Sequence, residues 1–271
     1  MEPWPREADL ESLPVRSAVL LHGFGDSPEC WSPMLAAIDA DLDVATPAAP
    51  GHARERMPPG AQLNLDLLAA VAIDHLRAAV DRAGGPVVLG GHSRGAMTAA
   101  ALAGSHPDLV AALYLEDPAW GWPPADGPDP AAAAQTAELA EWIHGLQSSS
   151  HEDRVQWCLD HNPGWPADEY DIWARAKSEV DPAALQRPVD LGRLHWPGIV
   201  AAIRCPTTLL VGEPARGSAC APEVVRHLRG ISTWRVIQVP GAGHDVRRCS
   251  RATAIDALLL TLQDAAEGAS G

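Results

Sequence analysis

Short apolar runs alternate with helical patterns along most of the chain. A continuous apolar run, such as 17–22 or the β-branched 86–90, is typical of a buried strand in a parallel sheet. Strands separated by helices indicate βαβ units, so we predict an α/β fold with a mostly parallel sheet flanked by helices. The expected strands are 17–22, 42–46, 86–90, 109–115, 207–212 and 233–239, and the expected helices are 28–38, 63–83, 94–105, 222–229 and 252–266.

The stretch from residue 118 to residue 195 breaks this alternation. It contains no β-branched run, and its helical patterns at about 130–146, 150–161 and 167–179 are separated by loops rich in Pro, Gly and Trp. We therefore predict a helical insertion at 118–195 within a core domain formed by residues 1–117 and 196–271.

The most specific local pattern is GHSRG at residues 91–95, which fits G-x-S-x-G. It directly follows the expected strand 86–90 and precedes an Ala-rich helix. A serine at such a sharp turn has a strained backbone, and its hydroxyl is held above the sheet where a carbonyl group can reach it. We therefore predict that Ser93 is a nucleophile. The alternative is a glycine-rich turn that carries a serine by chance.

Two further loops carry candidate groups that could act together with Ser93. HGFG at 22–25 follows the first expected strand, and PGAGH at 240–244 follows the last. His244 suits the role of general base because an imidazole titrates near neutral pH, and its Gly-rich loop lets the ring approach Ser93. The backbone N–H groups of Phe24 and Arg94 are the expected donors to an oxyanion. Either loop taken alone is equally well explained as a plain turn.

The order HGFG, GHSRG and PGAGH, each at the end of an expected strand, resembles the α/β-hydrolase superfamily. The resemblance covers essentially the whole chain apart from the insertion. It implies a Ser–acid–His triad in that chain order, a two-amide oxyanion hole and a helical cap, which would be 118–195. It does not identify a substrate, because this fold hosts many chemistries.

The acid of the implied triad departs from the commonest family pattern. The run LLVGEPAR at 209–216 places Ala215 where the family usually has Asp. Some lactonases and lipases that resemble this protein have the acid after the strand that follows the nucleophile helix, and here that strand ends in Glu116 and Asp117. Asp117 lies 117 − 93 = 24 positions after Ser93, the spacing expected from those relatives. We rank Asp117 first, then Glu116, then Glu213. An Asp-Pro turn without catalytic use is the alternative for Asp117.

Charge and composition narrow the class of partner. The chain has 20 basic and 35 acidic residues, a formal net charge of −15, which argues against binding nucleic acid or anionic membranes. It has no apolar run long enough to cross a bilayer and no apolar segment of a secretory signal near its start. Its five cysteines form no CxxC pair, and no spacing suggests a metal site. We expect a cytoplasmic protein that binds a small molecule and uses no metal or cofactor. A homodimer is one possible oligomeric state.

Tryptophan is concentrated in the insertion. Seven of the ten tryptophans lie in 118–195 or at its edges. Indoles form large, rigid, apolar walls, which favours a pocket for a bulky, mostly apolar or aromatic ligand, but they also pack cap helices together. Trp120, Trp122 and Trp165 are in expected loops and are the pocket candidates.

These features together predict a serine hydrolase that cleaves a small-molecule carboxylic ester or lactone through an acyl-enzyme. Two alternatives stay open. The same triad can catalyse acyl transfer, cyclisation, C–C cleavage or lyase chemistry. The chain could also be a non-catalytic ligand-binding member of the fold. Ala215 at the usual position of the acid favours this hypothesis, whereas the presence of both Ser93 and His244 argues against it.

Overall fold

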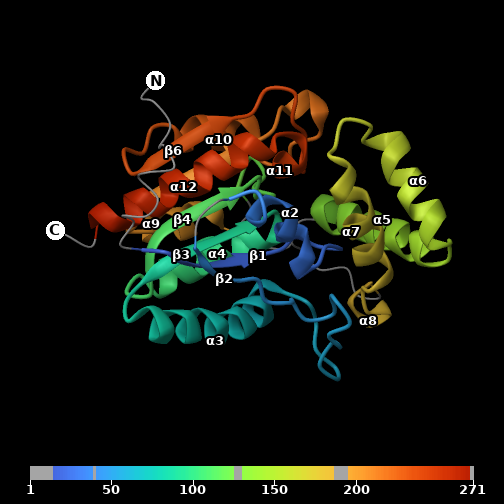
Figure 1. The fold of residues 1–271 in the computed structure, drawn as a ribbon, viewed down its shortest axis with the longest axis horizontal. Coiled ribbons are helices and arrows are strands. Elements are labelled where there is room, and N and C mark those ends of the chain that lie inside the picture. The colour runs from blue at the N-terminus through green and yellow to red at the C-terminus, as the bar shows by residue number, and fades with distance from the viewer. Residues whose placement is uncertain (1–14, 39–40, 125–129, 186–194, 269–271) are drawn as a thin grey trace.

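The computed structural model describes residues 15–38, 41–124, 130–185 and 195–268. Within these residues, six parallel strands form one sheet in the order β2-β1-β3-β4-β5-β6 (Figure 1). The predicted α/β class with a parallel sheet is therefore confirmed. The strands are β1 (Ser17–Leu21), β2 (Asp43–Ala45), β3 (Val87–His92), β4 (Val110–Glu116), β5 (Thr207–Val211) and β6 (Trp234–Gln238).

Helices connect the strands and differ from the prediction mainly near the start. The expected helix 28–38 is instead a 3-10 turn followed by a short α-helix, because Pro33 has no N–H and fits only the first turn of a helix. The helices of the core are η1 (Pro28–Trp31), α2 (Ser32–Leu35), α3 (Leu65–Ala83), α4 (Arg94–Ser105), α9 (Trp196–Ala202), η2 (Pro214–Arg216), α10 (Pro222–Leu228), α11 (Val246–Cys249) and α12 (Arg251–Gly268).

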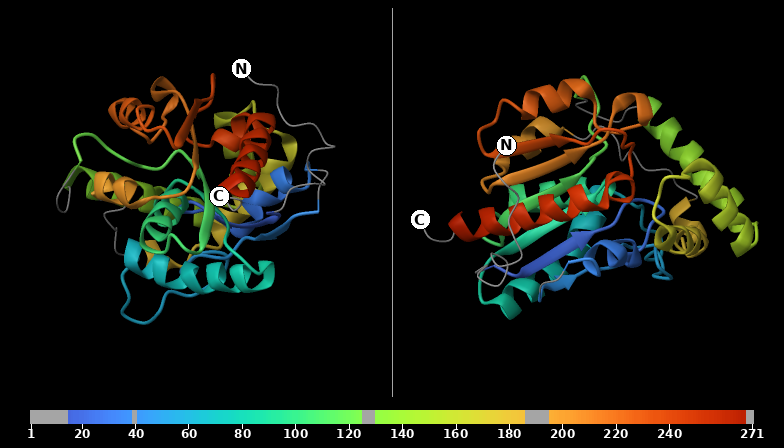
Figure 2. Two further views of the ribbon diagram at one scale, coloured as in Figure 1. Left: turned by 90° about the vertical axis from the view of Figure 1, so that its left-hand side faces the viewer. Right: turned by 45° about the horizontal axis from the view of Figure 1, so that its top comes forward.

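Alternate residues of the central strands face two separate hydrophobic layers. Val19 and Leu89 pack with α3, α4, α9 and α10, whereas Leu20 and Val88 pack with α2 and α12 on the other face. All four side chains are fully buried, so both faces of the sheet are covered, as Figure 2 shows. This rigid double-sided core fixes the loops at the carboxyl ends of the strands.

Four helices between β4 and β5 lie together beyond one end of the sheet (Figures 1 and 2). They are α5 (Pro130–Gln147), α6 (His151–His161), α7 (Ala167–Ser178) and α8 (Pro182–Leu185). That end carries the carboxyl ends of the strands, because the Lys177 ammonium of α7 donates a 2.7 Å hydrogen bond to the Gly25 carbonyl in the loop after β1. In the described part of the chain, no helix combines the length and apolarity needed to cross a bilayer.

Candidate active site

Ser93 occupies the sharp turn between β3 and α4. Its φ of 54° and ψ of −119° are strained for a residue with a side chain. The turn needs glycine two residues away on either side. A Cβ on Gly95 would lie 2.1 Å from the Leu21 carbonyl oxygen, and one on Gly91 would lie 2.4 Å from the carbonyl carbon of Gly95. The local sequence therefore holds a strained serine at the carboxyl end of the sheet.

The loop after β1 runs beside this turn. A Cβ built on Gly23 would lie 3.3 Å from the Cβ of Ser93, so the chain at Gly23 passes directly next to the serine. Among the described residues, the N–H groups of Phe24 and Arg94 have no hydrogen-bond acceptor. Both amides are therefore free to donate to an oxygen atom bound next to Ser93, as an oxyanion hole requires.

Asp117 follows β4 directly and is fully buried. Its Oδ2 accepts hydrogen bonds from His244 Nδ1 and from the Ala219 N–H, both at 2.7 Å, and its Oδ1 accepts one from the Ser218 hydroxyl at 2.6 Å. Its φ of 41° turns the chain sharply after the strand. Asp117 thus fixes the His244 ring with the proton on Nδ1, which leaves Nε2 as the basic nitrogen.

His244 is 34% exposed, so one edge of its ring is open to a ligand. Burial lowers its pKa, but the hydrogen bond and negative charge of Asp117 outweigh burial and raise the pKa above its ordinary value. Among the described residues, the Ser93 hydroxyl makes no hydrogen bond, to His244 or to any other group. Such contacts are often long without ligand and tighten when substrate binds.

His92 holds the loop that carries His244 in place through a hydrogen bond and a ring contact. Its Nε2–H donates a 3.0 Å hydrogen bond to the His244 carbonyl, and the two ring centroids are 4.7 Å apart. Burial first, and then the charge on His244, hold the pKa of His92 well below its ordinary value, so its ring is neutral. Gly23 is required here too, because a Cβ would lie 2.9 Å from His92 Nδ1.

The two alternative acids face other partners. Glu116 accepts a 2.6 Å hydrogen bond from the Tyr114 hydroxyl and a 2.9 Å bond from Arg247, and burial raises its pKa. Glu213 forms a surface ion pair with Arg216 at 3.5 Å. Neither carboxylate contacts His244, so Asp117 alone of the three ranked acids meets the imidazole.

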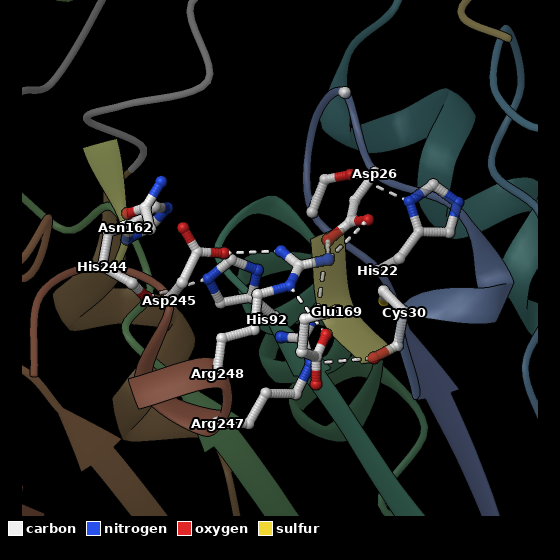
Figure 3. Close-up of polar contacts among 12 residues, drawn as sticks. His22, Asp26, Cys30, His92, Asn162, Glu169, His244, Asp245, Arg247 and Arg248 are labelled. Carbon is white, nitrogen blue, oxygen red and sulfur yellow. Dashed lines mark hydrogen bonds and ion pairs between the residues drawn. The ribbon is translucent and has the colours of Figure 1, made fainter. Parts of the chain in front are cut away.

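A buried cluster of charges links the loop after β1 with α7 and α11 (Figure 3). Asp26 accepts hydrogen bonds from Arg247 at 3.2 Å and from Arg248 at 3.1 Å. Arg248 also donates to Asp245 at 2.7 Å and to Glu169 of α7 at 3.1 Å. Because all the cluster's side chains except Asp245 are almost fully buried, this network ties α7, α11 and the loop after β1 into one unit.

One group of side chains has spacing suited to a metal ion. Asp26, His92 and Asp245 each offer a ligand atom, and these atoms lie within 4.8 Å of one another. However, the Arg248 guanidinium donates to both carboxylates and neutralises them. The donor set therefore does not fit a cation, which would have to displace a buried arginine.

The three tryptophans singled out from the sequence have different surroundings. Trp120 is fully buried against Trp196 and Trp234, so it is a core residue rather than a pocket wall, because a loop position does not by itself imply exposure. Trp122 is 48% exposed and lies beside Trp196. Trp165 borders a cleft of about 540 Å³ that also has His244 in its wall.

That cleft lies between the segment joining α6 to α7 and the loops after β5 and β6. Asn162 and Trp165, from the segment between α6 and α7, form one side, while Arg216, Gly243 and His244 form the other. Its volume falls in the range of ~300–1,000 Å³ that holds small organic ligands. A small molecule bound there would contact the imidazole directly.

A comparison of the sequence with known protein families agrees with this geometry. A model of the alpha/beta hydrolase family matches residues 18–256. The chain belongs to the alpha/beta hydrolase family. This matched range includes the strained serine turn, the acid after β4 and the histidine loop, as well as the helices between β4 and β5.

Two curated relatives of this hydrolase match only part of the chain. A pimeloyl-[acyl-carrier protein] methyl ester esterase of Aromatoleum aromaticum is 36% identical over 49% of this chain and 45% of its own. The lipase LipV of Mycobacterium tuberculosis is 38% identical over 40% of this chain and 39% of its own. The chain thus spans less than half the length of these relatives.

A solved structure is similar over most of this hydrolase. A thermophilic esterase from Thermogutta terrifontis covers 92% of this chain, which in turn covers 90% of the esterase, with a TM-score of 0.68 and 21% identity. At that identity the likeness shows a shared fold.

Several residues of the site carry no signal in the sequence. Ser218 and Ala219 lie in the loop after β5, where the family usually has its acid, and here that loop supplies hydrogen-bond donors to Asp117 instead. Arg247 and Arg248 come directly after the histidine loop in the polar run HDVRRCSR at 244–251, and nothing in that run marks them as buried.

Proposed function

We propose that this alpha/beta hydrolase is a serine hydrolase that cleaves a small-molecule carboxylic ester or lactone through an acyl-enzyme. The observation that carries the proposal is the 2.7 Å contact of His244 Nδ1 with the buried carboxylate of Asp117. This contact supports His244 as the general base, and the strained backbone of Ser93 in the turn after β3 supports Ser93 as the nucleophile. Ester chemistry is also what the names of the two curated relatives state for those proteins.

In this proposal, Ser93 attacks the ester carbonyl while His244 Nε2 accepts the proton of its hydroxyl. The C–O bond then breaks, and His244 returns the proton to the leaving alcohol. Water, deprotonated by the same imidazole, hydrolyses the acyl-enzyme and releases the acid. Asp117 stabilises the imidazolium that forms in each step.

The Phe24 and Arg94 amides would hold the carbonyl oxygen as it gains negative charge. In comparable sites, losing one such donor costs roughly 3–4 kcal/mol of transition-state stabilisation. The insertion, as a cap, would close over the cleft beside His244 and set which alcohol or lactone ring fits, with Trp165 as an apolar wall.

Labelling with a fluorophosphonate tests this proposal, because only an activated serine reacts. We expect one adduct per chain in the wild type and none in Ser93→Ala. Ser105→Ala, which alters a serine at the far end of α4, is the matched control and should be labelled like the wild type. Equal labelling of Ser93→Ala and wild type would remove the nucleophile from the proposal.

Product analysis separates hydrolysis from acyl transfer. With a 4-nitrophenyl ester as substrate, a hydrolase releases acid and alcohol in equal amounts even when methanol is added in moderate excess. Formation of methyl ester as the main product would instead indicate an acyltransferase that uses the same residues.

A further inference from the structure

The side chain of Arg94 is a buried cation that lacks an acidic partner. The residue is only 2% exposed, and no carboxylate of the described residues forms an ion pair with it. Its Nη1 has no hydrogen-bond partner, and its Nη2 lies 3.4 Å from His52 Nε2. This contrasts with Arg247 and Arg248, each of which is paired with at least two carboxylates.

The neighbouring histidines do not neutralise this charge. The Nδ1–H of His52 donates to the Pro50 carbonyl, and its Nε2 accepts from the Gly25 N–H, so its ring is neutral. His22 is arranged in the same way, with Nε2 accepting from Ala49. Burial first, and then the charge of Arg94, lower the pKa of both rings, that of His22 to about 4.

Arg94 nevertheless keeps its proton. Burial lowers its pKa to about 9, which is still well above neutrality. A buried, charged and unpaired guanidinium is strongly unfavourable unless an anion approaches it. Arg247 and Arg248 satisfy this requirement with protein carboxylates, whereas Arg94 has no carboxylate partner among the described residues.

A small cavity adjoins Arg94 on the side of β1. Its walls come from His22, from the loop after β2 around Ala49, from α3 at Leu68, and from Arg94 and Thr98 of α4. The space available to a water centre is about 20 Å³, compared with the ~10–15 Å³ that one water needs. It therefore has room for one or two water-sized atoms, such as the oxygens of a carboxylate.

The Arg94 guanidinium at this cavity also lies beside Phe24 in the loop after β1. Arg94 directly follows Ser93, and its guanidinium carbon is 5.2 Å from the centre of the Phe24 ring. Phe24 and Arg94 also supply the two amides proposed for the oxyanion hole. A group bound by the guanidinium would therefore lie beside the loop after β1, which carries one of the two proposed donors.

We propose that Arg94 binds a carboxylate on the acyl part of the substrate, so that the enzyme hydrolyses monoesters of short dicarboxylic acids. This inference rests on the proposed function, since it places the carboxylate relative to the ester that Ser93 attacks. The planar, two-pronged guanidinium matches the geometry of a carboxylate, and Nη1 is the donor left to be satisfied.

A pair of matched substrates tests the inference. 4-Nitrophenyl hemisuccinate and 4-nitrophenyl butyrate have the same leaving group and nearly the same acyl length, but only the first ends in a carboxylate. The wild type should have a higher kcat/KM for the hemisuccinate. Arg94→Met should lower the ratio of the two kcat/KM values roughly 10- to 100-fold, the cost of losing a hydrogen bond between charged groups. Arg77→Met, which removes an exposed arginine of α3, should leave the ratio unchanged.

A binding measurement separates this inference from the proposed function. In Ser93→Ala, which cannot turn over, succinate should raise the melting temperature, and chloride at equal ionic strength should not. The rise should disappear when Arg94→Met is added, and return in part with Arg94→Lys, which also serves if the Met variant fails to fold. If the wild type is labelled by fluorophosphonate but prefers the butyrate and is not stabilised by succinate, the carboxylate site is refuted while the hydrolase stands. Stabilisation by chloride alone would equally refute it.

Discussion

Asp117→Asn removes one negative charge from the site and almost nothing else. The oxygen that accepts from His244 and Ala219 has a direct counterpart in the Asn carbonyl. The oxygen that accepts from Ser218 becomes an amide NH₂, and the Ser218 hydroxyl can rotate to accept from it. The buried hydrogen bonds therefore survive the change, and the fold should tolerate it.

The expected loss of activity follows from the geometry of this pair. A hydrogen bond of 2.7 Å puts the centres of charge of the carboxylate and the imidazolium about 4 Å apart. At an effective permittivity of about 20, their attraction is about 4 kcal/mol, which corresponds to roughly a 10³-fold lower kcat/KM when the charge is removed. The imidazole must be neutral before it accepts the serine proton, so in the active form this attraction acts mainly on the transition state.

The pH profile gives a second, independent readout. His244 must be neutral to accept a proton, so activity rises with pH through its pKa, which Asp117 raises against the effect of burial. Without that charge the pKa falls, and the acid limb of kcat/KM should move to lower pH while the plateau drops. The assay is hydrolysis of a 4-nitrophenyl ester between about pH 5 and about pH 9, the range in which histidine titrates.

The control for this experiment is Asp81→Asn, which alters an exposed carboxylate on α3 and should match the wild type. A plateau within tenfold of the wild type, or an acid limb that stays in place, would refute the role given to Asp117. Loss of activity together with a large fall in melting temperature would show that the residue acts on the fold instead.

Three further substitutions test the residues that hold the candidate active site in place. Gly95→Ala should lower the free energy of unfolding in urea by about 3 kcal/mol, because a Cβ would meet a backbone carbonyl of β1 at 2.1 Å, whereas Gly85→Ala, with open space around it, should change it by less than about 0.5 kcal/mol. Ser218→Ala removes a 2.6 Å hydrogen bond to Asp117 and should lower kcat/KM about tenfold in steady-state assays, with a similar KM. Arg247→Met leaves two buried carboxylates short of a partner and should cost about 3–5 kcal/mol of stability in the same urea titration.

Local patterns in the sequence were sufficient to predict the sheet. The central strands β1, β3, β4 and β5 are short, mostly apolar runs, and the glycines around Ser93 mark the turn that only they can form. The choice of Asp117 as the first acid came from Ala215 at the usual position and from the distance to Ser93. Both signals lie within one short segment, which is why they can be recognised without a structure.

The parts that the sequence did not predict depend on contacts between distant segments. Ser218 donates to a carboxylate about a hundred positions earlier in the chain, and Arg248 donates to Glu169 of α7. No periodicity or motif marks such pairs. Trp120 is a second example. It is buried by contacts with Trp196 and Trp234, and the sequence around Trp120 does not predict these contacts.

The most direct test of the account is a crystal structure of the protein after reaction with a fluorophosphonate that mimics the tetrahedral intermediate. We expect a covalent bond from Ser93 Oγ to phosphorus, with the phosphoryl oxygen ~2.7–3.1 Å from the amide nitrogens of Phe24 and Arg94 and with His244 still hydrogen-bonded to Asp117. An adduct on another residue, or a phosphoryl oxygen turned away from both amides, would contradict it.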